Sequence, residues 1–202
     1  MIHILDNPLG AAGEEPLLQS MLADRKRLFI DLFGWKLPVI DGLYEIDQYD
    51  RAPVTYIVIA DDKGRHEASI RLMPTTSPHM LGDIFPHLCP HGVPAGPHIC
   101  ESSRLCLPQR HGAQRRRQLR NILISRMVDL AVDRGITCLT GILPEAFRKE
   151  VLAMGWAAEP LGPVIRDESG SIGAFAAHIA ADTPARLGWT GVYTIDAGQV
   201  PA

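Results

Sequence analysis

Charged side chains interrupt apolar stretches at several separate points of this sequence. Arg25 falls on the face of a predicted helix whose other members are apolar: Leu18, Met21, Leu22, Leu28, Phe29 and Leu32. Arg71 lies between two apolar residues in the predicted strand ASIRLMP, and Glu101 and Arg104 lie inside the apolar run ICESSRLCL. A buried charge is costly unless an opposite charge meets it, so each arginine either finds a carboxylate or carries its head group to water.

Carboxylates are concentrated in the stretch GLYEIDQYDRA, residues 42–52, which contains Glu45, Asp47 and Asp50. The stretch is either a solvated loop or a set of acids that are anchored to arginines elsewhere and face a cationic ligand. A calcium loop is not favoured, because the alternating ligands and the glycine of such a loop are missing.

Three arginines and three acids therefore stand out: Arg25, Arg71, Arg104, Asp47, Asp50 and Glu101. We expect them to line one polar cleft. Regular alternation along a strand would place Glu101 and Arg104 on opposite faces, so the strand is expected to bulge near Ser102 or Ser103.

The elements that must position these residues follow from periodicity and turn residues. Helices are predicted over residues 14–33, 114–134 and 145–154, with strands over 2–5, 54–60, 66–73, 99–107, 136–143, 172–180 and 190–195, and a loop over 86–98. Their interleaving predicts an α/β chain with a mixed sheet covered by helices.

Length and composition narrow the functional class. The 202 residues suit one domain, 1–202. The net charge of −3 argues against nucleic-acid binding, and no long apolar run or signal-like start is present, which indicates a cytoplasmic protein without a membrane partner. The four cysteines form no CxxC pair and fit reduced thiols; Cys100 and Cys106 are expected to fill the core.

The motifs in their order resemble the acyl-homoserine-lactone synthases, or autoinducer synthases, of bacterial quorum sensing. The resemblance runs from Arg25 through LFIDLFGW, EIDQYD, SIRLMPTTSPHML, IFPHL and ESSRLC, and more loosely to FRKEVLAMGW. Nine positions match the nearly invariant residues of that family: Arg25, Phe29, Trp35, Asp47, Asp50, Arg71, Phe85, Glu101 and Arg104.

The resemblance implies a fold like that of the acyl-CoA N-acyltransferases, a three-layer α-β-α sandwich with a bent mixed sheet. It implies that an acyl chain passes from acyl carrier protein, or acyl-CoA, to S-adenosylmethionine, which is a substrate, so that no cofactor is needed. The products would be an N-acyl-homoserine lactone, methylthioadenosine and the free carrier. The N-terminal part, about 1–75, would bind S-adenosylmethionine, and about 76–202 would bind the acyl donor.

Site roles follow from the same resemblance. The residues expected to bind S-adenosylmethionine are Arg25, Phe29, Trp35, Asp47, Asp50 and Phe85. The expected catalytic residues are Glu101, Arg104, Arg71 and Ser103, with Glu101 accepting the proton of the attacking amine and a backbone amide at the bulge stabilising the oxyanion. Lactone closure needs positioning more than a catalyst, because the sulfonium is a good leaving group.

The acyl donor has its own candidate residues. Thr140 and Gly141 are assigned to the acyl pocket; a glycine offers no hydroxyl to a 3-oxo group, so an unsubstituted chain is expected unless Thr140 takes that position. The loop QRHGAQ, 109–114, is similar to the pyrophosphate-binding loop of acetyltransferases. Acidic acyl carrier protein is expected to dock on the basic residues around it: Arg110, Arg115, Arg116, Arg117, Arg120, Arg148 and Lys149.

Two alternatives remain. An acetyl-CoA-dependent N-acetyltransferase would share the fold but leaves Arg25, Trp35, Asp47 and Asp50 unexplained. A zinc site would draw on His87, Cys89, His91, His98 and Cys100, whose spacing matches no zinc finger and whose prolines oppose a tight cage, so no metal is expected.

Overall fold

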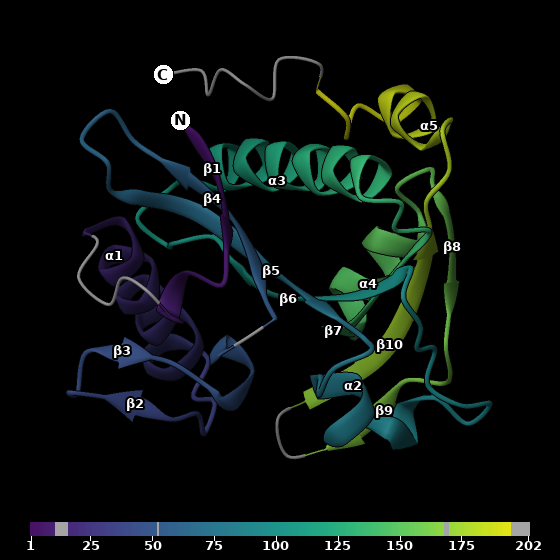
Figure 1. Cartoon of the computed structure of the whole chain (residues 1–202), viewed down its shortest axis with the longest axis horizontal. Helices are drawn as coiled ribbons and strands as arrows, with labels where there is room; N and C mark the ends of the chain where they lie inside the picture. Colours follow the sequence, from purple (N-terminus) through teal and green to yellow (C-terminus); the bar gives the residue numbers. More distant parts are fainter. Residues whose placement is uncertain (11–15, 52, 168–169, 195–202) are drawn as a thin grey trace. The chain divides into compact units, whose positions relative to one another are not determined.

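The computed structural model describes residues 1–10, 16–51, 53–167 and 170–194 (Figure 1). These residues divide into two compact units. Unit 1 holds the described residues of 1–71 and 104–126, and unit 2 holds those of 72–103 and 127–194. Residues 104–126 belong with the N-terminal unit. The division into a part that binds S-adenosylmethionine, about 1–75, and a part that binds the acyl donor, about 76–202, stays a prediction.

Unit 1 contains an antiparallel run of strands. β1 (Ile2–Asp6) pairs with β4 (Thr55–Ala60), from Ile2 opposite Ile59 to Asp6 opposite Thr55, and β4 neighbours β5 (His66–Pro74). β4 reads TYIVIA, and its five residues from Tyr56 onward are buried, which suits its β-branched and aromatic composition. All three strands were predicted within two residues.

The helix predicted over 14–33 is present but changes its geometry midway. α1 (Pro16–Arg25) continues directly as a π-helix, η2 (Lys26–Leu32), and its predicted first residues, 14 and 15, lie outside the described residues. A π-helical stretch is uncommon and is found often at functional sites. It follows Arg25 at once and carries Phe29 on its buried side.

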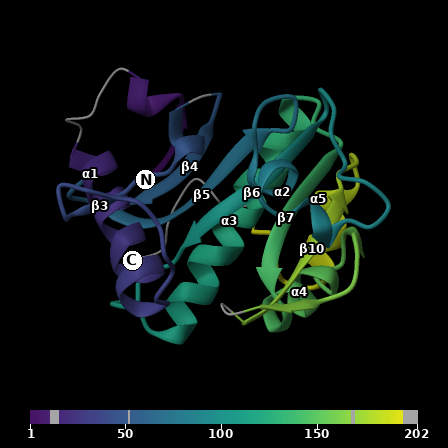
Figure 2. The same ribbon diagram turned by 90° about the horizontal axis from the view of Figure 1, so that it is seen from below.

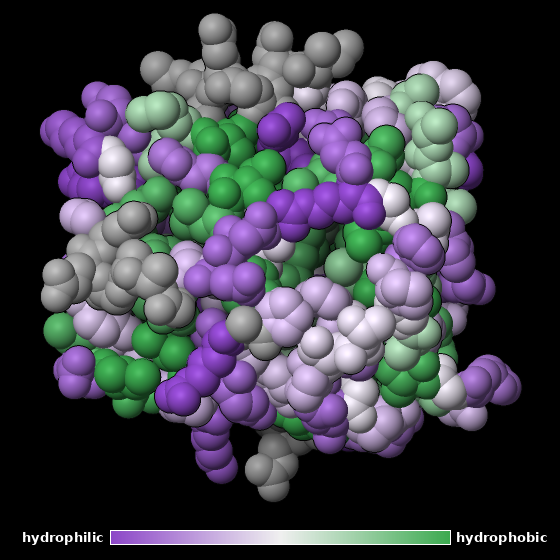
Figure 3. All heavy atoms as spheres, in the orientation of Figure 1, coloured by the Kyte–Doolittle hydropathy of each residue, from purple (hydrophilic) through white to green (hydrophobic). Residues whose placement is uncertain are grey.

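Several short elements before and after α1 were not predicted from the hydrophobic periodicity of the sequence. A 3-10 turn, η1 (Pro8–Gly10), precedes α1, and the hairpin of β2 (Val39–Ile40) and β3 (Tyr44–Glu45) leads to the 3-10 turn η3 (Gln48–Arg51). β3 contacts α1. The apolar side chains of the hairpin, Val39, Ile40 and Leu43, are exposed. Figure 3 shows apolar and polar side chains intermixed on the face that it presents.

Unit 2 contains parallel and antiparallel pairs. β6 (Ile99–Cys106) pairs in parallel with β7 (Cys138–Pro144), and β10 (Gly170–His178) is antiparallel to β7, to β8 (Ala157–Pro160) and to β9 (Ile165–Asp167). The predicted mixed sheet is therefore confirmed.

Helices pack against these strands. α4 (Glu145–Leu152) contacts β7, β8 and β10 (Figure 2). The Pro-rich segment forms α2 (Met80–Asp83), the 3-10 turn η4 (Pro86–Leu88) and then loop, as predicted for most of 86–98. α3 (Ala113–Asp133) lies within one residue of its prediction, and Gly135 follows it in the left-handed region, with φ +66°.

The strand predicted over 190–195 is wrong for its described part. Residues 190–194 form no strand; they follow helix α5 (Thr183–Trp189), and residue 195 lies outside the described residues. The β-type composition of 192–194 is overruled by the end of α5, where the backbone N–H groups of Val192 and Tyr193 bond to Leu187 O. Among the described residues, no helix combines the length and the apolar character needed to cross a membrane.

Candidate active site

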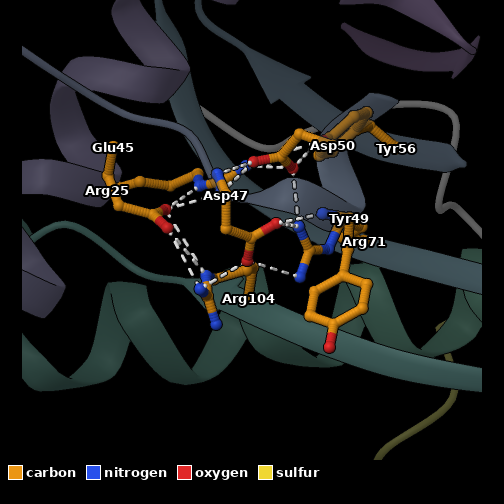
Figure 4. A network of polar contacts seen from close by, with 8 residues as sticks. All are labelled: Arg25, Glu45, Asp47, Tyr49, Asp50, Tyr56, Arg71 and Arg104. Carbon is orange, nitrogen blue, oxygen red and sulfur yellow. Dashed lines mark hydrogen bonds and ion pairs between the residues drawn. The ribbon is translucent and has the colours of Figure 1, made fainter. Parts of the chain in front are cut away.

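Arg25 is the centre of a buried polar network in unit 1 (Figure 4). Its side chain is fully buried, and Nε donates to Glu45 Oε2 at 2.5 Å. Nη1 and Nη2 donate to the two oxygens of Asp50 at 3.0 and 2.9 Å. The guanidinium therefore bridges two carboxylates, and the paired geometry toward Asp50 is the strong, bidentate kind.

Asp47 joins the other two arginines. Arg71 Nη1 and Nη2 lie 2.7 and 3.1 Å from the oxygens of Asp47, and Arg71 Nη1 also donates to Asp50 Oδ1 at 2.6 Å. Arg104 Nη2 donates to Asp47 Oδ2 at 2.6 Å and to Glu45 Oε1 at 3.0 Å. Three guanidinium groups and three carboxylates thus form one network without net charge, which is the condition under which so many buried ions are tolerated.

The spacing of the acids has a local cause. The backbone N–H of Asp47 donates to Asp50 Oδ2 at 2.7 Å, and the N–H of Tyr49 donates to Asp47 Oδ1 at 2.9 Å. These contacts fold the EIDQYD stretch into the turn η3, so that both aspartates point to the same side. The stretch is a buried anchor for arginines, not a solvated loop.

The charges of the network stabilise one another. Burial opposes ionisation of Asp50, but the neighbouring Arg25 and Arg71 outweigh it and hold the pKa of this carboxyl well below its usual range. Burial raises the pKa of the Tyr56 phenol; Arg25 opposes this rise and Asp50 adds to it. Tyr56 therefore keeps its proton and donates it to Asp50 Oδ1.

The network contains one carboxylate that we did not predict for it. Glu45, which is fully buried, is the third carboxylate beside Asp47 and Asp50. Glu101 belongs to unit 2, where Oε2 accepts the backbone N–H of Leu81 at 2.8 Å. The signal for Glu45 was its position two residues before Asp47 in an extended stretch, which puts both side chains on one face. Tyr56 was also missed.

β6 has an irregular backbone at Arg104. This residue has φ +52°, in the left-handed region that a residue other than glycine seldom adopts. The Cα pairs between β6 and β7 run from Ile99 to Glu101. Glu101 and Arg104 are both buried, and the bulge that we expect near Ser102 or Ser103 stays a prediction.

Aromatic side chains lie beside the network. The rings of Phe29 and Trp35 are stacked, with centroids 5.1 Å apart and planes 7° apart, and Phe33 lies 5.8 Å from Trp35. The guanidinium carbon of Arg104 lies 5.7 Å from the centroid of Phe29. Such faces attract cations, so they suit a ligand that carries positive charge.

The remaining site residues lie in unit 2. Phe85 is half-buried and packs against a cluster that contains Leu81 and Leu88, and Ser103 is half-buried in β6. The hydroxyl of Thr140 is buried and has no hydrogen-bond partner among the described residues. Gly141 is closely surrounded by Phe175 and Ser102, so that no side chain fits at this position.

The residues predicted to dock the acyl carrier divide into exposed ones and ones that are buried or hold other groups. Arg117 is exposed, and Lys149 is exposed and pairs with Glu145 at 2.7 Å. Arg148, which we expected at the surface, is buried: its Nη2 donates to Gly162 O at 3.0 Å and its Nη1 lies over Gly173, where no side chain fills the space. The helical pattern alone could not show that Gly173 leaves space for this side chain.

The basic residues near the QRHGAQ loop are also partly engaged. Arg116 Nη1 donates to Gln109 Oε1 and to His111 O, Arg115 lies 3.9 Å from Glu67, and Arg120 donates to Asn121. Arg110 contacts both oxygens of Asp24 at 2.8 and 2.9 Å, beside a cavity of about 260 Å³ that Asp24, Arg27, Leu28, Pro108, Gln109 and Arg110 line.

A second buried cluster was missed by sequence analysis. His66 is fully buried, with Nδ1 2.8 Å from Asp24 Oδ2 and Nε2 3.0 Å from Ser69 Oγ. Burial lowers the pKa of His66 although Asp24 opposes the shift. His66 therefore ties α1 to β5 as a neutral ring.

Three carboxylates of the network are also close enough together to share a metal ion. Among the described residues, the group close enough to share an ion is Glu45, Asp47 and Asp50, with oxygens within 4.8 Å of one another. Their arginine partners already supply the positive charge. The histidines and cysteines proposed for zinc form no such group in the described part of the chain, and all four cysteines are buried free thiols.

Comparisons with known proteins agree on one family. A model described as autoinducer synthase matches residues 12–184. An acyl-homoserine-lactone synthase of Ralstonia nicotianae is 34% identical over 178 residues, which cover 85% of this chain and 86% of the relative.

Solved structures give the same answer for the fold. The acyl-homoserine-lactone synthase LasI superposes with a TM-score of 0.82 at 25% identity, covering 93% of each chain. An acyl-CoA N-acyltransferase from Pseudomonas aeruginosa, at 13% identity and a TM-score of 0.58 over 88% of this chain and 99% of that chain, shares the fold alone. The expected acyl-CoA N-acyltransferase-like fold is confirmed, and the chain belongs to the autoinducer synthase family.

Proposed function

We propose that this chain transfers an acyl group from a thioester donor to the amine of S-adenosylmethionine and closes the homoserine lactone, with release of methylthioadenosine. Within an autoinducer synthase, the observation that supports a substrate role for unit 1 is its buried, charge-balanced network of Arg25, Arg71 and Arg104 with three carboxylates. Such a network can present fixed charges to a zwitterionic substrate without reorganising.

Within that network, Asp47 and Arg104 are the members through which we expect substrate contact. They are 6% and 7% exposed, whereas Arg25, Glu45, Asp50 and Arg71 are at most 1% exposed. S-adenosylmethionine offers a carboxylate to Arg104 and cationic groups to Asp47 and to the stacked faces of Phe29 and Trp35. The more deeply buried pairs then serve as the scaffold that holds these contacts.

Glu101 is the proposed proton acceptor of the acylation step. Its Oε2 accepts the Leu81 N–H, and this bond fixes the orientation of the carboxylate. The neutral amine attacks the thioester carbonyl, its proton passes to Glu101 directly or through a water, and the thiolate leaves. The substrate carboxylate then attacks the carbon next to the sulfonium, and methylthioadenosine departs. We propose that Arg71, Arg104 and Ser103 assist catalysis of this reaction. Phe85 is proposed to contact S-adenosylmethionine.

The donor is proposed to be acyl carrier protein or acyl-CoA. Among the predicted docking residues, Arg117 is an exposed cation of unit 1 and Lys149 is an exposed cation of unit 2, and an acidic carrier suits either of them. We also propose a cytoplasmic location, where both substrates are made and where the four free cysteines stay reduced.

The test is direct product analysis. Purified protein is incubated with S-adenosylmethionine and an acyl thioester, and lactone and methylthioadenosine are quantified by mass spectrometry. We expect equal amounts of both products. Acetylation of added amines by acetyl-CoA, without methylthioadenosine, would instead support the N-acetyltransferase alternative. Running acyl carrier protein and coenzyme A thioesters in parallel identifies the donor.

A further inference from the structure

His79 is a buried imidazole in unit 2 that the proposed reaction does not yet use. Its residue is 6% exposed, and Nδ1 lies 2.9 Å from Ser77 O. A carbonyl oxygen can only accept, so Nδ1 carries the hydrogen in this contact, and in an imidazole with one hydrogen the other nitrogen, Nε2, is then an acceptor. Nε2 is buried and has no hydrogen-bond partner among the described residues.

Gly82 provides the space for this ring. A Cβ at position 82 would lie 2.8 Å from His79 Cε1 and 2.9 Å from Nε2, closer than real contacts allow. Gly82 is not among the glycines with positive φ, so a special backbone conformation does not explain it. The imidazole therefore occupies the position that a side chain at residue 82 would need.

His79 lies at the start of a short helix, α2, that is hydrogen-bonded to the proposed base, Glu101. His79 is the N-cap residue of α2 (Met80–Asp83), and the Leu81 N–H in the first turn donates to Glu101 Oε2 at 2.8 Å. A helix of four residues is not stable by itself, so its position depends on the contacts at its ends and on the burial of Leu81. His79 supplies the contact at the N-terminal end.

Packing alone does not account for an imidazole here. A buried acceptor left without a donor costs about 1–3 kcal/mol, so an apolar side chain would fill the space more stably. The feature that an apolar side chain lacks is the bond to Ser77, which fixes the backbone just before α2.

We propose that His79 is a positioning residue for Glu101. Its Nδ1–H bond to Ser77 O sets the start of α2, and the Leu81 amide, carried by α2, orients the Glu101 carboxylate for proton transfer. This inference rests on the proposed function, in which Glu101 accepts the proton of the amine.

A double-mutant cycle tests the coupling. The rate of methylthioadenosine release is measured at saturating substrates for the wild type, His79→Leu, Glu101→Gln and the double variant. We expect His79→Leu to lower kcat about tenfold with both KM values within about twofold. In the Glu101→Gln background the same change should have no further effect, because His79 acts only through Glu101.

Two further variants separate positioning from fold stability. His79→Asn places an amide N–H near the former Nδ1 and should recover kcat to within about threefold of wild type. Gly82→Ala keeps the imidazole but displaces it, so it should lower kcat as His79→Leu does. The exposed His91 provides the control, since His91→Leu should leave kcat unchanged.

The outcomes distinguish the inference from the function on which it rests. Wild-type kcat in Glu101→Gln would remove Glu101 from its proposed role. If Glu101→Gln is impaired, equal fold effects of His79→Leu in both backgrounds would overturn the positioning role alone. No effect of His79→Leu, or no recovery in His79→Asn, would overturn it as well.

Discussion

Arg104 Nη2 lies 2.6 Å from Asp47 Oδ2, and the same carboxylate also binds Arg71 at 2.7 Å. Asp47 is thus shared by two buried guanidinium groups, and Arg104 is held at the same time by Glu45. Removal of any one partner leaves a buried charge without its counter-charge. Breaking such a pair costs about 3–5 kcal/mol, so whole side-chain deletions combine effects on folding and on activity.

Charge-preserving and isosteric changes are the sharper test of this pair. Arg104→Lys keeps the charge but loses the forked geometry, and Asp47→Asn keeps the shape but loses the charge. We expect lactone synthesis to fall at least about 100-fold in both, with circular dichroism showing a folded protein for Arg104→Lys. A variant with near wild-type activity would exclude that residue from the site. Lys26→Arg, at an exposed pair with Asp31, is the matched control.

The structure moves the test of acyl-chain specificity from Gly141 to Thr140. A Cβ at Gly141 would lie 2.8 Å from Phe175 Cε1 and 2.9 Å from Ser102 O, so Gly141→Thr should destabilise the protein and is unsuitable as a specificity test. The buried hydroxyl of Thr140 has no hydrogen-bond partner within the described part of the chain, so we predict that it donates to a 3-oxo group of the acyl chain.

Thr140→Val should therefore lower the share of 3-oxo over unsubstituted lactone about 2- to 12-fold, which corresponds to one hydrogen bond of about 0.5–1.5 kcal/mol. The measurement is mass spectrometry of lactones made from equal amounts of the two acyl donors. The loss of an unsatisfied hydroxyl should not reduce thermal stability. An unchanged product ratio would exclude Thr140 from the acyl pocket.

The docking surface can be tested at Arg117 without disturbing the loop. Arg116 binds Gln109 and the His111 carbonyl, so changes there also affect structure. Arg117→Glu should raise the KM for acyl carrier protein about two- to fivefold and leave that for S-adenosylmethionine unchanged, as expected for an exposed charge. Arg65→Glu, at another exposed arginine, is the control. Equal effects on both substrates would contradict a docking role.

The buried His66 predicts how stability depends on pH. Because burial lowers its pKa from 6.5, the unfolded chain binds more protons than the folded one at pH values just below 6.5. The contribution of His66 to the free energy of unfolding is therefore complete above pH 6.5. It is lost as the pH falls from 6.5 toward the lowered pKa of the folded state, at up to about 1.4 kcal/mol per pH unit.

Urea unfolding between pH 7.5 and 5 measures this slope. His66→Gln keeps polar contacts toward Asp24 and Ser69 but does not titrate, so its stability should vary less over this range. If the free energy of unfolding falls equally with pH in the variant and the wild type, His66 does not cause the loss of stability at acid pH.

The sequence by itself determined the family, the main strands and helices, and most of the residues of the buried network. Periodicity shows which face of an element is apolar, and so it identified Arg25, Arg71 and Arg104 as charges that need partners. It does not show which elements meet. Only the tertiary structure decided that Glu45, in a two-residue strand that contacts α1, joins the buried network of Arg25. Arg148 was expected at the surface but is buried for the same reason. The space over Gly173 that it fills exists only once α4 lies against β10.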